Sequence, residues 1–279
     1  EGITSLAHSS EFKRLFSGSL DRSIQLWDTS AHQPTAVAQL RGHRGAVSAL
    51  AASKYKLVSG SADHSATVWD LATTRDDSKL LGHTGPIHAV IVMHDLCITL
   101  SQDKTMKIWD LRLKACVMTL PTKARGQYGM AVHNMQIISA SGTKIQTWDL
   151  RKVAAEVMTV EQIADIGCGN FGSGNANGVY AHQMMGDRLY TSAVDNSVRL
   201  WDLRSLQVKA KIVGHTDFVR ALAGAGETLM TASDDKTIRV WDLEFHDCAR
   251  VLKGHESYIT SLLCAKGRLY SGSMDKTIR

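Results

Sequence analysis

The chain has 279 residues, a formal net charge of +5 and a charged fraction of 21%. This mildly basic balance does not by itself predict nucleic-acid binding, and no apolar run approaches the length of a membrane span. The five cysteines include no Cys-x-x-Cys pair, so buried thiols of a reduced protein explain them better than disulfides do. We expect an intracellular protein, cytoplasmic or nuclear, without nucleic-acid or membrane partners.

Tryptophan followed by aspartate recurs along the chain at a spacing near forty residues. All six tryptophans take part, at Trp27, Trp69, Trp109, Trp148, Trp201 and Trp241. A Gly-His pair keeps a fixed distance to this motif, because His43, His83 and His215 each precede a tryptophan by 26 residues. Two markers held at one interval predict a repeated structural unit.

A third element lies between these two markers. The segments 59–63 and 271–275 read Ser-Gly-Ser-x-Asp, within alternating apolar and polar residues that predict strands and a turn. With these three elements the whole chain resembles WD-repeat β-propellers. The resemblance implies blades of four antiparallel strands around a central channel. The short loop after the first strand resembles that of propellers in F-box and RING ubiquitin ligases and in myosin heavy chain kinases.

Seven strand-turn-strand cores can be counted, followed by six outer strands such as those near 36–40, 117–120 and 250–252. The spacing from His255 would place a seventh tryptophan at position 281, beyond Arg279. We therefore predict an all-β, seven-bladed propeller in a single domain over residues 1–279, cut from a longer chain, with its seventh blade incomplete. Such a complete propeller is expected to be monomeric.

The fourth and fifth blades depart from the pattern. The fourth has Ser-Gly-Thr-Lys at 141–144 where a turn aspartate is expected, and no Gly-His pair precedes it. The glycine- and asparagine-rich residues 166–178 lengthen the interval before Trp201, and predict a mobile loop on the rim between these blades. Residues 167–172 also spell Gly-x-Gly-x-x-Gly, but no helix follows to receive a phosphate. We expect no cofactor.

Each full repeat contains a hydroxyl, a histidine and an aspartate, which is the residue set of a nucleophilic triad. Because the set recurs in several blades with a tryptophan attached, we interpret it as structural, and predict no catalytic or metal site. The family resemblance implies a buried hydrogen-bond chain from aspartate through histidine and hydroxyl to the indole. Its members are His43, Ser59, Asp63 and Trp69; His83, Thr99, Asp103 and Trp109; and His215, Thr231, Asp235 and Trp241, with His255, Ser271 and Asp275 in the last blade.

Partner binding is expected on the face where the Gly-His loops and aspartate turns emerge, as the resemblance implies. Large residues gather at equivalent positions there, and aromatic residues and arginine dominate interface hot spots. The candidates are Leu20, Tyr180, Phe218, Arg220, Tyr258 and Met274. Only Arg220 fits the arginine cluster with which F-box propellers hold phosphorylated peptides, so phosphopeptide recognition is disfavoured.

Trp-Asp-x-Arg occurs three times, with arginines at Arg112, Arg151 and Arg204. In the family this motif resembles the box of substrate receptors in cullin-RING ubiquitin ligases. The first function hypothesis is therefore a non-catalytic scaffold that binds proteins or peptides through the Gly-His face. The alternative is a ligase substrate receptor that docks through these arginines.

Overall fold

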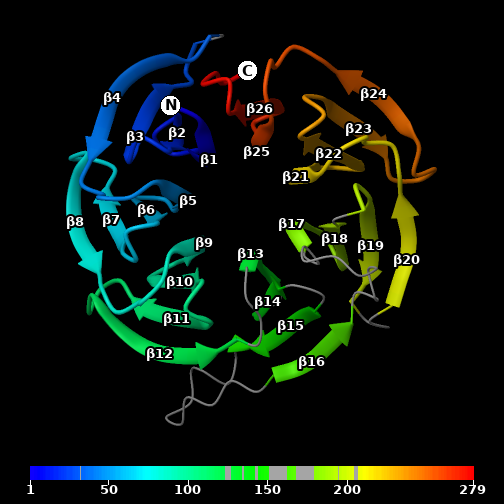
Figure 1. Ribbon diagram of the computed structural model, residues 1–279. Helices are drawn as coiled ribbons and strands as arrows, with labels where there is room; N and C mark the ends of the chain where they lie inside the picture. Colours follow the sequence, from blue (N-terminus) through cyan, green and yellow to red (C-terminus); the bar gives the residue numbers. More distant parts are fainter. Residues whose placement is uncertain are drawn as a thin grey trace. The chain divides into compact units, whose positions relative to one another are not determined.

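The computed structural model describes residues 1–31, 33–122, 127–133, 135–141, 144–150, 162–167, 179–193, 195–203 and 207–279 (Figure 1). These residues form 26 β-strands and contain no α-helix. The strands belong to two compact units, Glu1–Lys123 with Arg268–Arg279, and Ala124–Gly267. The single domain over residues 1–279 stays a prediction.

The first unit holds three four-stranded antiparallel sheets, each with its strands in chain order. Their strands are β1 (Ile3–Ser9), β2 (Arg14–Ser19), β3 (Ser23–Asp28) and β4 (Thr35–Arg41); β5 (Val47–Ala52), β6 (Lys56–Ser61), β7 (Ala66–Asp70) and β8 (Arg75–Leu80); and β9 (Ile87–Met93), β10 (Leu96–Ser101), β11 (Thr105–Asp110) and β12 (Ala115–Pro121). Strand β26 (Arg268–Ser273) also belongs to this unit.

The second unit holds three further sheets of the same order. Their strands are β13 (Gln127–His133), β14 (Gln136–Ser141), β15 (Lys144–Asp149) and β16 (Gln162–Gly167); β17 (Val179–Met185), β18 (Arg188–Ala193), β19 (Val198–Asp202) and β20 (Gln207–Ile212); and β21 (Val219–Ala225), β22 (Thr228–Ser233), β23 (Ile238–Asp242) and β24 (Cys248–Leu252). Strand β25 (Ile259–Ala265) pairs with β26.

Six four-stranded sheets correspond to six complete blades, and β25 with β26 is a pair of strands only. The count of seven blades therefore stays a prediction. The predicted loop at 166–178 begins later than expected, because Ile166 and Gly167 are the last residues of β16. Residues 168–178 lie outside the described part of the chain.

A break in strand register occurs at the tryptophan in all six sheets, where the third strand pairs with the fourth. In the second sheet the shift falls between Val68 and Trp69, and the other five sheets shift at Trp27, Trp109, Trp148, Trp201 and Trp241. A bulge of this kind bends a strand and increases its twist. The tryptophan repeat thus marks a recurring change of direction as well as a buried ring.

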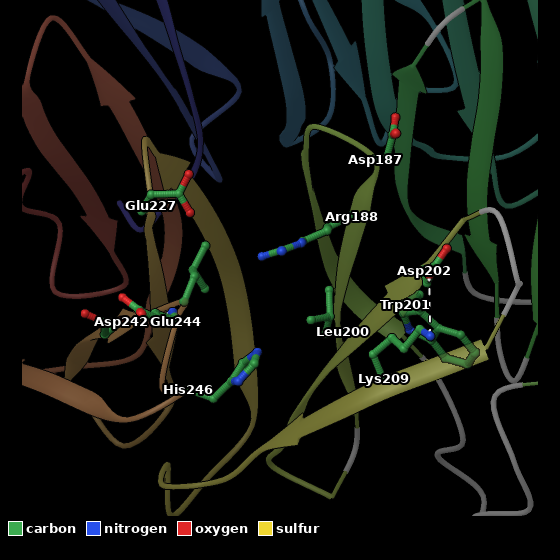
Figure 2. Close-up of a pocket in the computed structure, with 11 residues that line it drawn as sticks. Asp187, Arg188, Leu200, Trp201, Asp202, Lys209, Glu227, Asp242, Glu244 and His246 are labelled. Carbon is green, nitrogen blue, oxygen red and sulfur yellow. Dashed lines mark hydrogen bonds and ion pairs between the residues drawn. The ribbon is translucent and has the colours of Figure 1, made fainter.

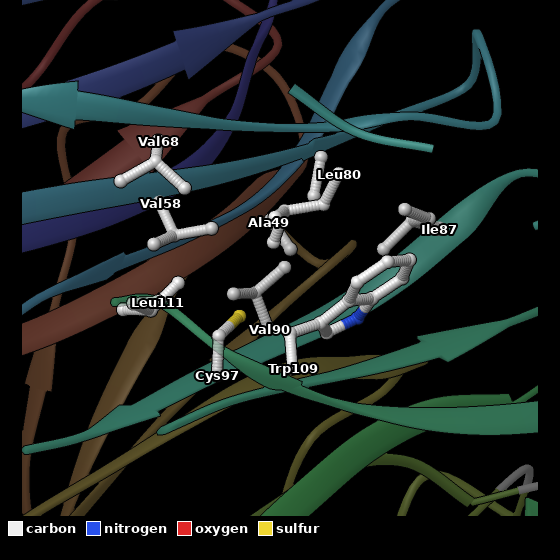
Figure 3. Close-up of a cluster of buried hydrophobic side chains, with 10 residues drawn as sticks. Ala49, Val58, Val68, Leu80, Ile87, Val90, Cys97, Trp109 and Leu111 are labelled. Carbon is white, nitrogen blue, oxygen red and sulfur yellow. The ribbon is translucent and has the colours of Figure 1, made fainter. Parts of the chain in front are cut away.

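Neighbouring sheets pack face to face through small and branched apolar side chains. Between the second and third sheets the cluster includes Val58, Ile87, Val90 and Trp109, all at most 7% exposed (Figure 3). Gly60 lies under this cluster, since a Cβ there would come within 2.6 Å of the Ile87 Cγ2. The close approach of the two sheets therefore requires glycine at this position.

First strands of neighbouring sheets in the first unit are also joined by hydroxyl groups. The Thr4 hydroxyl on β1 donates to the Val47 carbonyl on β5. In the same way, the Ser48 hydroxyl on β5 donates to the Ile87 carbonyl on β9. Thr4 and Ser48 therefore connect one sheet to the next.

We expect Gly60→Ala to lower the free energy of unfolding by about 1–3 kcal/mol, because the added methyl group overpacks the contact with Ile87 and Val90. Urea unfolding followed by circular dichroism gives the value. Ala36→Ser on the exposed face of β4 is the control and should stay within about 0.5 kcal/mol of the wild type. Equal midpoints for the two variants would contradict this expectation, because the neighbouring sheet would then accommodate the added methyl group without loss of stability.

Candidate functional site

The candidate triad of the second sheet is a continuous hydrogen-bond chain. The Nδ1 atom of His43 lies 3.0 Å from Asp63 Oδ2, and its Nε2 atom lies 2.7 Å from Ser59 Oγ. The indole N–H of Trp69 donates to the same Ser59 oxygen at 2.8 Å. Because a carboxylate only accepts, the proton of the ring sits on Nδ1, and Nε2 accepts from the hydroxyl.

Two further sheets repeat this geometry closely. In the third sheet, His83 lies 2.7 Å from both Asp103 and Thr99, and the Trp109 indole donates to Thr99 at 2.8 Å. In the sixth sheet the distances from His215 to Asp235 and Thr231, and from Trp241 to Thr231, are 2.7, 2.7 and 2.8 Å. Such repetition of one geometry is typical of a structural network.

The turn aspartate joins this chain to the loop that follows the histidine. Asp63 Oδ2 also accepts from the backbone N–H of Arg44 at 2.8 Å, and Oδ1 accepts from the Ser65 hydroxyl at 2.6 Å. Burial raises the pKa of Asp63, but these hydrogen bonds outweigh it and hold the pKa well below its usual value. The same balance lowers the pKa of Asp103 to about 2.

In two of the Gly-His pairs the glycine makes room for the indole ring. A Cβ on Gly42 would lie 3.1 Å from the Trp69 Cη2, and one on Gly214 would lie 2.8 Å from the Trp241 Cη2. The ring therefore packs over the glycine while its N–H reaches the hydroxyl bonded to the adjacent histidine. This double contact explains why the Gly-His pair keeps a fixed distance from tryptophan.

The hydroxyls of these sets are inaccessible to a substrate. Ser59, Thr99 and Thr231 are 0% exposed, and each oxygen is held by both a histidine and an indole. A nucleophile must reach its substrate and give its proton to a base. The arrangement can fix the geometry of a blade, but these three oxygens cannot attack a bound molecule.

Where the Gly-His pair is missing, cations bind the turn aspartate. In the fifth sheet Trp201 still donates to Thr191 at 2.8 Å. Asp195 there lies 3.2 Å from the guanidinium of Arg199 and 3.0 Å from the ammonium of Lys211. Of the predicted set in the last blade, His255 falls in one compact unit, and Ser271 with Asp275 in the other.

The six predicted partner-binding residues divide between the two compact units. Leu20 and Met274 belong to the first, where Gly2 touches both of them. The Leu20 N–H donates to the Gly2 carbonyl at 3.1 Å, and a Cβ on Gly2 would lie 2.4 Å from the Met274 sulfur. Leu20 is 40% exposed, so an apolar side chain is available at this edge.

The other four belong to the second unit. Tyr258 is 47% exposed and Phe218 is half-buried. The Arg220 guanidinium donates to both oxygens of the buried Asp234 carboxylate, with Nη2 2.6 Å from Oδ2. Arg220 is therefore committed to an ion pair, which reduces its availability to a partner. The side chain of Tyr180 lies outside the described residues.

The proposed docking arginines are only partly described. The Arg112 side chain is 71% exposed and lies 3.6 Å from Asp95 and 3.5 Å from Asp110. Arg151 and Arg204 lie outside the described residues. In the sixth sheet the equivalent position holds Glu244, so the charge of this edge reverses between blades. The sequence itself contains this difference, because Glu244 follows Trp241-Asp242 by two residues.

Metal and membrane chemistry receive no support from the described residues. None of their His, Cys, Asp and Glu side chains form a group of three able to hold a metal ion. The same part of the chain has no helix with the length and apolar character that a bilayer crossing requires.

We expect Asp63→Asn to lower the free energy of unfolding by about 1–3 kcal/mol, because it weakens the acceptor for His43, Arg44 and Ser65 within a buried network. Asp76→Asn is the matched control, since Asp76 lies exposed on β8. The midpoints of urea unfolding curves for the two variants test this expectation. If both variants unfold at the wild-type midpoint, the network does not stabilise the blade.

Stability should also depend on pH. Burial lowers the pKa of His43, His83 and His215 below 6.5, although the aspartates oppose it. The unfolded chain then binds protons more readily than the folded chain. The stability present above pH 6.5 is therefore lost as the pH falls from 6.5 through the lowered histidine pKa values of the folded state. A second loss should begin below pH 3.8, the ordinary value, as Asp63 and Asp103 take up protons.

Urea titrations at about pH 7.5, 5.5 and 3 measure this dependence. The free energy of unfolding should fall at each step. A chain that is equally stable at the two higher pH values would contradict the assignment of neutral histidines in the folded state.

A model of the family described as "WD domain, G-beta repeat" matches residues 1–28, 34–70, 76–110, 206–242 and 246–279. These segments make up more than half of the chain. The unmatched stretch 111–205 contains the fourth sheet and the core of the fifth, where the repeat departs from its pattern. The match includes all three sheets in which the complete hydrogen-bond network is present.

Proteins named Mitochondrial division protein 1 are similar to this chain. The one from Pyricularia oryzae is 27% identical over 236 residues, 79% of this chain and 35% of that protein. The one from Neurospora crassa is 27% identical over 230 residues, 77% and 34% of the two chains. The chain spans about a third of the length of these relatives. With its repeat geometry and the family match, the chain belongs to the WD40-repeat β-propeller family.

Proposed function

We propose that the chain is a non-catalytic scaffold that binds proteins or peptides on the edge of its blades formed by the Gly-His loops and aspartate turns. The observation that carries this proposal is the contrast between polar and apolar side chains at that edge. The polar groups beneath it are held in hydrogen bonds, whereas Tyr258 and Leu20 keep 47% and 40% of their surface exposed. Exposed aromatic and large apolar groups are what a protein interface uses.

Complete closure of the propeller by a seventh blade is part of this proposal, as is a monomeric state. The relatives' name concerns mitochondrial division, which favours a cytoplasmic over a nuclear location for this chain. A scaffold that takes part in mitochondrial division is a more specific version of the same proposal. The partners themselves are expected to be proteins or peptides.

The alternative is a substrate receptor of a cullin-RING ligase, docking through Arg112, Arg151 and Arg204. The exposure of Arg112 supports it. Against it, Arg112 already lies near two aspartates, and Glu244 replaces the arginine in the sixth sheet. The scaffold proposal therefore has the better physical support.

We expect the combined variant Phe218→Ala and Tyr258→Ala to lose most partners recovered from cells, because truncating two hot-spot side chains weakens affinity by about a hundredfold or more. Arg220 stays unchanged, since its removal would leave Asp234 buried and unpaired. Affinity purification with quantitative mass spectrometry gives the partner list, after circular dichroism has shown that the variant folds.

Tyr55→Ala with Leu113→Ala is the matched control. These side chains are 55% and 71% exposed and lie in turns at the other ends of the strands. If the control variant loses the partners and the test variant keeps them, the interface lies at that other edge of the blades. Loss of a cullin-RING adaptor alone, on reversing Arg112, Arg151 and Arg204 to glutamate, would favour the alternative.

A further inference from the structure

Two hollows in the second unit join into one groove between the fifth and sixth sheets. Their volumes are about 810 and 480 Å³. Both are lined by Asp187, Arg188, Glu227 and Leu243. The groove runs past the β17–β18, β21–β22 and β23–β24 turns, and Figure 2 shows the side chains of its larger part. These turns lie at the opposite ends of the strands from the Gly-His loops.

The floor of the groove is apolar and already buried by the fold. Leu200, Trp201 and Leu243 are 5%, 2% and 4% exposed, and Met184 with Met185 line the narrower end. Phe245 follows Glu244 along the chain and is 68% exposed. A groove of this kind can receive an aliphatic side chain from a partner.

The walls are acidic although the whole chain is basic. Five carboxylates line the larger hollow, at Asp187, Asp202, Glu227, Asp242 and Glu244, against the two cations Arg188 and Lys209. Lys209 already lies 3.7 Å from Asp202. The carboxylates of Glu227 and Glu244 are exposed and form no ion pair with any described residue. Since the chain carries +5 overall, this negative charge is a local feature of the groove.

Two details favour a peptide over a small ion. The turn glycines Gly186 and Gly226 have φ angles of 58° and 56°, and a Cβ on either would meet nothing within 4 Å, so the turns leave space for a second backbone. The His246 Nε2 atom is buried without a hydrogen-bond partner among the described residues. A backbone amide or carbonyl placed in the groove would supply that partner.

We propose that this groove binds an extended segment of a partner protein in which lysine or arginine alternates with aliphatic residues. One aliphatic side chain packs on Leu200 and Leu243. The long basic side chains beside it reach Glu227 and Glu244 on the walls, because their flexible stems can bend toward a charge. This site is a second surface, independent of the scaffold face proposed above.

Fluorescence anisotropy with the whole chain tests the proposal. The probe is a short fluorescein-labelled peptide of alternating lysine and leucine. It should bind at least about tenfold more tightly than matched peptides of alternating glutamate and leucine, or of lysine and serine. Equal binding of the glutamate peptide would overturn the charge argument, and equal binding of the serine peptide would overturn the apolar floor.

The decisive variant is Glu227→Lys with Glu244→Lys. Like charges should then weaken binding of the lysine-leucine probe at least about tenfold. Glu11→Lys with Asp76→Lys changes the net charge equally at exposed positions of the other unit, and should bind the probe as the wild type does. The same loss in both variants would show a non-specific effect of charge and overturn the proposal.

Glu227→Gln with Glu244→Gln keeps the side-chain shape, and serves if the lysine variant fails to fold. It should weaken the probe several-fold, and unchanged affinity would overturn the proposal. Phe218→Ala with Tyr258→Ala should bind the probe normally. That result separates this groove from the scaffold face, so that either proposal can fail alone.

Discussion

An indole N–H donated to a buried hydroxyl is the interaction on which the regular blades depend, and it is present at Trp27, Trp69, Trp109, Trp201 and Trp241. A tryptophan has one donor and no acceptor, so burying its ring requires a partner inside the sheet. Ser59, Thr99 and Thr231 supply it, and each hydroxyl in turn bonds to the histidine of the Gly-His loop that precedes it in the chain. The turn aspartate then fixes that loop. Four residues far apart in sequence become one rigid unit.

Much of this could be predicted from the sequence because each link depends on residue type and spacing. The interval between His43 and Trp69 predicted the repeated strands, and the family resemblance implied which side chains bond to one another. The recurring bulge at the tryptophan could not be predicted, since alternation of apolar residues does not show where pairing slips by one residue. The two cations at Asp195 could not be predicted either, because Arg199 and Lys211 come from different strands and no sequence motif connects them to this aspartate.

The candidate binding residues show a sharper limit of sequence reasoning. Position along a repeat indicates which edge of a blade a side chain occupies, but not what it touches. The residue type of Arg220 predicts a partner contact, but its guanidinium is bound to Asp234. Conversely, Glu227 and Glu244 lie in different turns of the sixth sheet, and only packing of that sheet beside the fifth makes a groove of them.

The hydroxyl bonds from Thr4 to Val47 and from Ser48 to Ile87 have a consequence for motion. Each bond crosses from one sheet to the next, so a sheet cannot peel away without leaving its neighbour's carbonyl unsatisfied. Local opening in the first unit is thereby coupled across three sheets. Amide hydrogens of β1, β5 and β9 should exchange with solvent as one cooperative group, while the exposed fourth strands fray independently at their edges.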